Sequence, residues 1–354
     1  MYFQNRLPYA SMKNKPGFYL KRVFGFILFL VAVLVVTNYS LVVYGLRQLN
    51  GQMHIIFNTR PINEMLTDSA VSDSVKLQLK YIEEVKKFAI DSLGLKASKN
   101  YTTFYDQENK PILWVLTASD PYKIKAYQWR FPLLGNVSYK GFFDFEIGME
   151  AELEMIEKGY DTDYDDVSAW STLGWFKDPV LSGMLKRGKG QLAELIIHEM
   201  THATLYLKSN VDKNENLASV CGEIGAERFL ESKYGFSSKE LADYINQKKD
   251  YELFSKHMLW GTHLLDSVYQ TIDDSITIYK KTVKDNMINA IVSGLDTITF
   301  HKPHAFGLVF KKRMPNNAYF LNFVRYDAQK DKMKEELVEK FNGNIRRYID
   351  SLRD

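Results

Sequence analysis

The chain of 354 residues contains a single cysteine, Cys221. It therefore forms no intrachain disulfide and no cysteine-based zinc finger, and any metal must be held by His, Asp or Glu side chains. Histidine is also scarce, with seven in the whole chain. We expect Cys221 to be a small buried filler, because free cysteine behaves as a small apolar residue.

Basic residues do not outnumber acidic ones over most of the chain. The formal net charge is +3, and residues 1–22 hold five basic side chains and no acid, which leaves −2 for the remainder. This balance excludes a nucleic-acid partner for the body of the protein. Internal repeats, low-complexity stretches and linkers rich in Pro, Gly or Ser are also missing. We therefore treat residues 47–354 as one folded unit.

Charge of either sign is missing from residues 23–46, which include the run "VFGFILFLVAVLVV". A helix of that length rises about 36 Å, enough to cross a hydrocarbon layer of about 30 Å. We predict a single transmembrane anchor at 23–46, with 1–22 as a basic cytoplasmic tail and the rest of the chain outside the cytoplasm. The alternatives are a cleaved signal peptide and a buried helix. No A-x-A-like cleavage site follows the run, and no nearby cysteine permits a lipid anchor.

The remaining sequence predicts an α+β domain that is predominantly helical. Residues 75–93 carry apolar side chains at three-and-four spacing and precede Gly94, as in an amphipathic helix. Residues 111–119 and 136–145 are short β-rich runs, 146–160 favour a helix, and 164–176 favour a strand followed by a loop. Beyond residue 230 the patterns are mostly helical.

The stretch "HEMTH" holds His198 and His202 four residues apart within an apolar segment. On a helix these two imidazoles share one face and can bind one tetrahedral metal ion. Glu199 projects about 100° round the helix, near such a metal but not bound to it, which is where a general base acting on water stands. The alternative is a pair of histidines that are hydrogen-bonded in a core or on the surface. Unpaired imidazoles in a buried helix are costly.

A catalytic metal needs a third protein ligand, for which Glu215 and Glu223 compete. We expect the histidine helix to run to about residue 207, and the next helix to begin with Asn214 as its cap. Seven extended residues span up to about 23 Å, enough to return Glu215 to the histidines. Glu223 lies about 80° further round that helix and is either near the metal or solvated.

The stretch "NENLA", residues 214–218, resembles the Asn-Glu-x-x-Ala element that carries the third ligand of gluzincin peptidases. Several further segments occur in the order typical of one family. From the N-terminus they are "YGLRQLNGQMHIIFNTRPINEML", "VSYKGFF", "WSTLGWFKDPVLSGML" and "PNNAYFLNFVRYD". Over residues 39–330 the chain is similar to the aminopeptidase family of bacterial membrane-bound or lipoprotein zinc peptidases. Three departures are the missing lipidated cysteine, Asn216-Leu217 in place of Ser-Phe, and Ser219 where some gluzincins have an acid.

The resemblance implies a zincin-like (gluzincin) fold over 47–354, with Zn2+ held by His198, His202 and Glu215. It implies Glu199 as the catalytic base and a peptide or protein as substrate. It also implies a location in the bacterial inner membrane, with the catalytic domain on the periplasmic side. Whether such an enzyme trims N-termini or cuts internally is open.

Three further side chains are candidates near the site. Tyr206 lies four residues after His202, on the same face of the expected helix, and its hydroxyl can stabilise an oxyanion. Tyr326 is a second candidate for that role. Packing in the core is the alternative for both tyrosines. Glu194, one turn before His198, is either a surface acid or one that orients a ligand.

These patterns leave two functions open. The first is a membrane-anchored zinc peptidase, an aminopeptidase by its resemblance, whose peptide lies along an edge formed by residues 167–172. The second is a non-catalytic, membrane-tethered binding protein that keeps the zincin fold. The intact Glu199 favours the first, because a structural site has no need of a base.

Overall fold

The computed structural model describes residues 16–131, 135–167, 177–207, 210–271, 277–303, 306–326 and 330–353. The chain forms two compact units, Met1–Gln52 and Met53–Asp354.

The N-terminal unit contains helix α1 (Pro16–Thr37) and most of helix α2 (Tyr39–Phe57). Residues 23–46, which we expected to form one helix, are divided at Asn38. The backbone keeps its helical bonds from the Asn38 amide to Leu34 and from the Val42 amide to Asn38. The Asn38 Nδ2 atom also donates to the Leu34 carbonyl, and the Thr37 hydroxyl donates to the Val33 carbonyl; side-chain bonds of this kind often bend helices. Within the described residues no single helix is long and apolar enough to cross a membrane; Lys21–Thr37 and α2 meet the length and composition criteria only together, with a 90° bend.

The second unit is predominantly helical, which confirms the predicted α+β class. Helix α4 begins after Ser72, whose hydroxyl accepts a hydrogen bond from the Val75 amide, and it covers nearly all of the predicted residues 75–93. The helices are α3 (Ile62–Thr67), α4 (Asp73–Asp91), α5 (Phe145–Glu157), α6 (Lys189–Thr204), α7 (Val211–Tyr234), α8 (Lys239–Thr271), α9 (Thr277–Gly294), α10 (Gly307–Phe310), α11 (Asn317–Tyr326), α12 (Lys330–Phe341) and α13 (Ile345–Ser351).

The described strands form three small sheets. The first has the order β1-β2-β8, in which β1 is antiparallel and β8 parallel to β2. The second has the order β6-β3-β7 and is antiparallel, and the third pairs β4 with β5. The strands are β1 (Arg60–Pro61), β2 (Thr103–Tyr105), β3 (Trp114–Ser119), β4 (Trp129–Phe131), β5 (Gly135–Val137), β6 (Lys140–Phe142), β7 (Asp161–Asp166) and β8 (Val180–Leu181).

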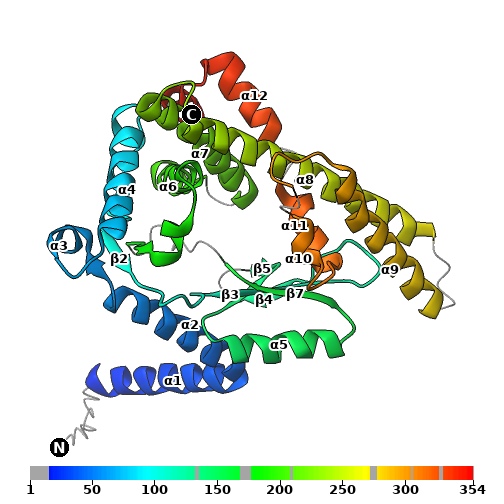
Figure 1. The fold of residues 1–354 in the computed structure, drawn as a ribbon. Coiled ribbons are helices and arrows are strands. Elements are labelled where there is room, and N and C mark those ends of the chain that lie inside the picture. Colours follow the sequence, from blue (N-terminus) through cyan, green and yellow to red (C-terminus); the bar gives the residue numbers. More distant parts are fainter. Residues whose placement is uncertain are drawn as a thin grey trace, which may run out of the picture. The chain divides into compact units, whose positions relative to one another are not determined.

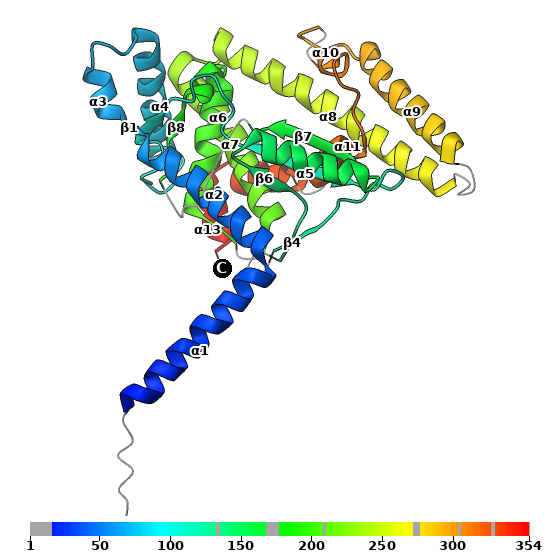
Figure 2. The ribbon, with the colours of Figure 1, turned by 90° about the horizontal axis from the view of Figure 1, so that it is seen from below.

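The β6-β3-β7 sheet lies between two helices. Helix α5 covers one face of strands β3 and β7 and helix α11 covers the other (Figure 1). Seen from below, α5 lies in front of these strands (Figure 2). The free edge of β7 is closed at Thr162, whose carbonyl oxygen accepts hydrogen bonds from Asn316 Nδ2 at 2.7 Å and Arg313 Nη2 at 3.0 Å. The peptide edge predicted at 167–172 lies, apart from Val167, outside the described residues.

Two hydrophobic clusters stabilise the second unit. The larger one joins α4, α6 and α7 with the β1-β2-β8 sheet, and the smaller one joins α8, α9 and α11. Helices α6 and α7 pack closely together, and α4 packs on α6 (Figure 1). The histidine helix is therefore part of the larger core.

Candidate functional site

Helix α6 presents both histidines of the HEMTH stretch. Its apolar side, formed by residues such as Leu192, Ile196 and Met200, is fully buried in the larger core. His198 and His202 stand one turn apart, and their Nε2 atoms lie 3.1 Å from each other. The structure thus places the two imidazoles together, as the four-residue spacing predicts.

Helix α6 ends at Thr204, earlier than the predicted residue 207. The hydroxyls of Thr201 and Thr204 bond back to the carbonyls of Ile197 and Met200, and Leu205 is extended with φ −142° and ψ 126°. The expectation that Tyr206 continues the histidine face is therefore wrong.

Tyr206 lies in the extended segment beyond the helix, and 43% of its surface is exposed. The alternative that Tyr206 packs in the core is wrong as well. Its hydroxyl remains a candidate donor for an oxyanion.

Helix α7 begins differently from the prediction. Asn210, rather than Asn214, caps it, because the Asn210 side chain accepts from the Lys213 amide at 3.1 Å. Asn214 stands in the first turn, 1% exposed, and its side chain bonds the backbone of Leu207 at both the amide and the carbonyl. Asn214 therefore joins the segment that leaves α6 to the start of α7.

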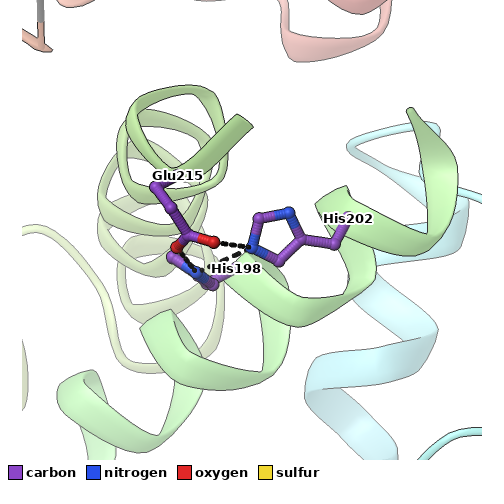
Figure 3. A group of neighbouring side chains, drawn as sticks. All are labelled: His198, His202 and Glu215. Atoms are coloured by element: carbon purple, nitrogen blue, oxygen red, sulfur yellow. Dashed lines mark hydrogen bonds and ion pairs between the residues drawn. The ribbon is translucent and has the colours of Figure 1, made fainter. Parts of the chain in front are cut away.

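Glu215 follows Asn214, whose two hydrogen bonds to the Leu207 backbone we call the Asn214 clamp. The Glu215 side chain points at both histidines. Its carboxylate oxygens lie 3.4 Å from His198 Nε2 and 3.5 Å from His202 Nε2 (Figure 3). Within the described ranges this is the one group of three metal-type side chains whose ligand atoms all lie within 4.8 Å of one another. The geometry brings together the three residues that the sequence singled out as ligands.

The dimensions of this triangle fit a tetrahedral ion. Zinc–nitrogen bonds of about 2.0–2.1 Å at tetrahedral angles separate two ligand atoms by roughly 3.3 Å. The observed separations of 3.1, 3.4 and 3.5 Å are close to that value. Two imidazoles and one carboxylate are also the donor set of a common class of catalytic zinc sites.

The same triangle is electrostatically coupled. Burial by itself raises the pKa of Glu215, but hydrogen bonding to His198 and His202 outweighs it and lowers that pKa to about 2. Burial lowers the pKa of His202, while the Glu215 and Glu199 carboxylates raise it and prevail. The charged form of Glu215 is thus held beside the histidines, as a metal ligand must be.

Glycine lets α6 and α7 approach at this point. A Cβ atom at Gly222 would lie 3.0 Å from the Glu194 carbonyl oxygen and 3.3 Å from His198 Cβ. One at Gly225 would lie 2.9 Å from Ile197 Cγ2. The close contact sets the distance between the helix that carries the histidines and the helix that carries Glu215.

Glu199 follows His198 on α6 and is 8% exposed.

The Nδ1 atom of the ligand candidate His202 is buried and has no hydrogen-bond partner among the described residues. Metal-bound histidines usually donate this second ring N–H to an acceptor. Ser219, which stands where some gluzincins have an acid, supplies no such bond among the described residues.

Glu223 does not join the histidines, so the alternative third ligand is not supported. It is 4% exposed and forms ion pairs with Lys248 at 2.8 Å, with Lys334 at 3.5 Å and with Lys330. It is therefore not solvated, and lysines from α8 and α12 neutralise its charge. Glu194, half-buried, accepts a hydrogen bond from the Tyr244 hydroxyl at 2.9 Å.

The other sequence candidates are less informative. Cys221 is fully buried, and burial raises the pKa of its thiol to about 12, which confirms its role as an inert filler. Tyr326 ends α11, and its side chain lies outside the described residues. The sequence did not reveal that Asn214 bonds the Leu207 backbone or that Gly222 lets α6 and α7 approach, because neither residue type by itself indicates which segment it contacts.

A sequence model of the family described as "Putative aminopeptidase" matches residues 43–354 of the chain. The chain belongs to this aminopeptidase family. The match supports a peptidase-like function and includes all of α6 and α7, and so the His198, His202 and Glu215 triangle. No curated protein and no solved structure gives a significant match to the chain. The membership therefore supports hydrolysis of peptides as the class of activity.

Proposed function

We propose that this member of the aminopeptidase family is a membrane-anchored, zinc-dependent peptidase with a zincin-like (gluzincin) fold. The observation that carries the proposal is the triangle of His198, His202 and Glu215, whose edges match tetrahedral zinc. These three residues would hold the ion, and Glu199 would act on the reacting water. Zinc supplies a Lewis acid that polarises the peptide carbonyl and lowers the pKa of water.

The protein's own groups would then move the protons. Glu199 would take a proton from the attacking water and later deliver it to the leaving amine. The Tyr206 hydroxyl, exposed just beyond the end of α6, would donate a hydrogen bond to the carbonyl oxygen as it gains negative charge. A free peptide N-terminus is the expected feature of the substrate, in keeping with the family description.

The membrane anchor belongs to the same proposal. The apolar side chains of α1, among them Val23, Phe24 and Val36, are largely exposed. We propose that residues 23–46 hold the protein in a bacterial inner membrane, with the basic tail 1–22 in the cytoplasm and the catalytic domain outside it. Protease added to spheroplasts should digest the C-terminal unit. Protection of that unit, with loss of the tail alone, would reverse the topology.

The catalytic proposal is tested with detergent-solubilised full-length protein and a peptide library with free and blocked N-termini. We expect about one zinc per chain, and cleavage of free-ended peptides that a chelator abolishes. Glu199→Gln should keep the zinc and lower kcat by about 10²–10⁴. Glu194→Gln, on the same helix, is the matched control and should change kcat little.

Two results would contradict the enzyme. One is a zinc-loaded wild type that cleaves nothing in the library, and the other is a Glu199→Gln variant as active as wild type. Either result would favour the membrane-tethered binding protein. Cleavage of blocked peptides at internal bonds would keep the peptidase but replace exopeptidase by endopeptidase action.

A further inference from the structure

A hollow of about 450 Å³ lies between strand β7 and residues 308–319, a segment that includes most of α10 and the start of α11. Pockets of this size commonly hold small molecules. The residues that line it include neither Glu199 nor any of the three candidate metal ligands. The hollow is therefore separate from the candidate active site.

Part of the lining is apolar and open to solvent. Leu308, Val309 and Met314 line the hollow, with 56%, 61% and 41% of their surfaces exposed. Phe310 holds α10 in the smaller core, where its ring centroid lies 5.4 Å from that of Tyr319. Apolar side chains gathered in a concave site gain free energy when a ligand removes them from water. This part of the lining fits an apolar ligand body.

Strand β7 contributes two carboxylates. Alternate residues of a strand share a face, so Asp163 and Asp165 project from the same face of β7, and both line the hollow. Asp165 is exposed. The Asp163 side chain is 20% exposed, and its one ion pair within the described residues is to Arg313 Nη1, at 3.9 Å. Two negative charges thus stand beside an apolar surface.

The cations of the hollow neutralise these acids only in part. The Arg313 guanidinium also donates to the Thr162 carbonyl at 3.0 Å and to Glu152 at 3.4 Å, so its charge is shared. Lys312 lines the hollow too, but it forms an ion pair with neither aspartate in the described part of the chain. Burial, only partly opposed by Arg313, raises the pKa of Asp163 to about 6. A carboxylate in this environment is stabilised by a further cation.

We propose that this hollow binds an amphipathic cation, an amine that carries an aliphatic or aromatic body. The ammonium group would pair with Asp163 and Asp165, while the apolar body would cover Leu308, Val309 and Met314. A free amine and the lysine side chain of an apolar peptide segment offer this same chemistry. The site does not depend on the metal or on the proposed peptidase activity.

The first test titrates the full-length protein in lipid nanodiscs with phenethylamine, followed by ligand-observed NMR at pH 7.5. Phenethyl alcohol and phenylpropionate carry the same ring with a neutral or an anionic group. We expect both to bind about tenfold more weakly than the amine, or less, because they lack the charged hydrogen bonds to the aspartates.

Substitutions on β7 locate the amine. Asp163→Asn should weaken its binding about tenfold, since hydrogen bonds between charged groups are strong where they are partly buried. Asp165→Asn should weaken it about two- to fivefold, because exposed ion pairs contribute less. Asp166→Asn is the matched control: this neighbouring residue projects from the other face of the strand, so affinity should not change.

The pH dependence gives a second readout of the same contact. Affinity for phenethylamine should fall as the pH is lowered from 7.5 to about 5, because Asp163 takes up a proton near pH 6. Asp163→Asn should remove most of this fall. Lys312 and Arg313 keep their charge over this range and do not contribute to it.

A blocked peptide, acetyl-Leu-Lys-Leu-amide, separates the two sources of the cation. Tighter binding of this peptide than of phenethylamine would assign the hollow to a peptide segment, and weaker binding to a free amine. Three results would overturn the proposal: no binding of either cation at millimolar concentration, equal or tighter binding of the alcohol or the anion, and loss of amine binding in Glu215→Ala but not in Asp163→Asn. The last result would place the amine at the metal site.

Discussion

The Asn214 side chain grips the backbone of Leu207 with two hydrogen bonds. Its Oδ1 atom accepts from the Leu207 amide and its Nδ2 atom donates to the Leu207 carbonyl, both at 2.8 Å. Because Glu215 is the next residue, this clamp sets where the candidate third ligand stands relative to α6.

Loss of these two hydrogen bonds should weaken the proposed zinc site more than it destabilises the fold. We expect Asn214→Ala to weaken zinc affinity by about 10- to 100-fold, as removal of a group that orients a ligand typically does. Competition with a chromophoric chelator measures the affinity. The control is Asn210→Ala, which removes the cap of the same helix and should cost about 1 kcal/mol of stability with affinity unchanged. Equal losses of affinity in both variants would contradict a specific role for Asn214.

The two competing glutamates should separate cleanly in metal analysis. Glu215→Ala should lose the zinc. Glu223→Gln should retain it but lower the free energy of unfolding by about 1–3 kcal/mol, because the partly buried Lys330 would lose its counter-ion and Lys248 would keep only Glu227. Urea unfolding measures the second effect. Loss of zinc from the Glu223 variant alone would show that the ligand assignment is wrong.

The glycine contact between α6 and α7 predicts a steric effect. We expect Gly222→Ala to push the helices apart, since its Cβ would lie 3.0 Å from the Glu194 carbonyl oxygen. Overpacking of this kind costs about 1–3 kcal/mol, and zinc affinity should fall with stability. Gly307→Ala, where no atom lies within 4 Å of the added Cβ, is the control and should destabilise little. An unchanged affinity in Gly222→Ala would mean that helix spacing does not govern the site.

Tyr206→Phe tests the oxyanion role directly. The hydroxyl lies on an exposed residue, so its removal should leave the unfolding midpoint unchanged. If it donates to the developing oxyanion, we expect kcat to fall by about 10²-fold with KM little altered. An unaltered kcat on the best peptide found would remove Tyr206 from the mechanism.

Asp163 on β7 predicts a pH dependence of stability away from the metal site. It lines a hollow of about 450 Å³ between β7 and residues 308–319, and burial, opposed by the nearby Arg313, raises its pKa to about 6. The folded protein then holds a proton that the unfolded chain releases near pH 4. Stability should therefore fall as pH rises from about 4 to about 6, by at most about 3 kcal/mol.

Asp163→Asn should remove that loss. Urea unfolding should show it more stable than wild type at pH 7.5 and equal to it at pH 4. Asp165→Asn, at an exposed position of the same strand, should change stability by less than about 0.5 kcal/mol at either pH. A stabilisation by Asp163→Asn that is the same at both pH values would contradict a partly buried carboxyl that titrates in this range.

Local patterns predicted much of this structure. Helix α4 followed from apolar spacing and a serine cap, and the pairing of His198 with His202 followed from one turn of helix. Each depends on residues within about four positions of one another, where backbone geometry alone decides which side chains meet. A short return of the chain permitted Glu215 as the third ligand, and the resemblance of "NENLA" to the gluzincin element selected it over Glu223.

Features that depend on distant residues were not predictable in this way. Asn210 and Asn214 are the same residue type in one turn, and only the contact with Leu207 distinguishes clamp from cap. From the sequence, Glu223 was an alternative third ligand, or an acid near the metal or in solvent. Its partner Lys330 lies more than a hundred residues away, so local patterns do not reveal the ion pair. The bend of the N-terminal apolar run at Asn38 coincides with hydrogen bonds from the Asn38 and Thr37 side chains to carbonyls of the preceding turn, which hydropathy does not register.

All three candidate ligands lie on two consecutive helices, and twelve residues separate His202 from Glu215. An ion bound at the proposed site would close a short loop, of the twelve residues between His202 and Glu215. Since the entropy of closing a loop grows only with the logarithm of its length, such a short closure removes little freedom from the unfolded chain. Metal binding should therefore link α6 and α7 locally. We expect the ion to be lost and rebound while the surrounding helices stay folded.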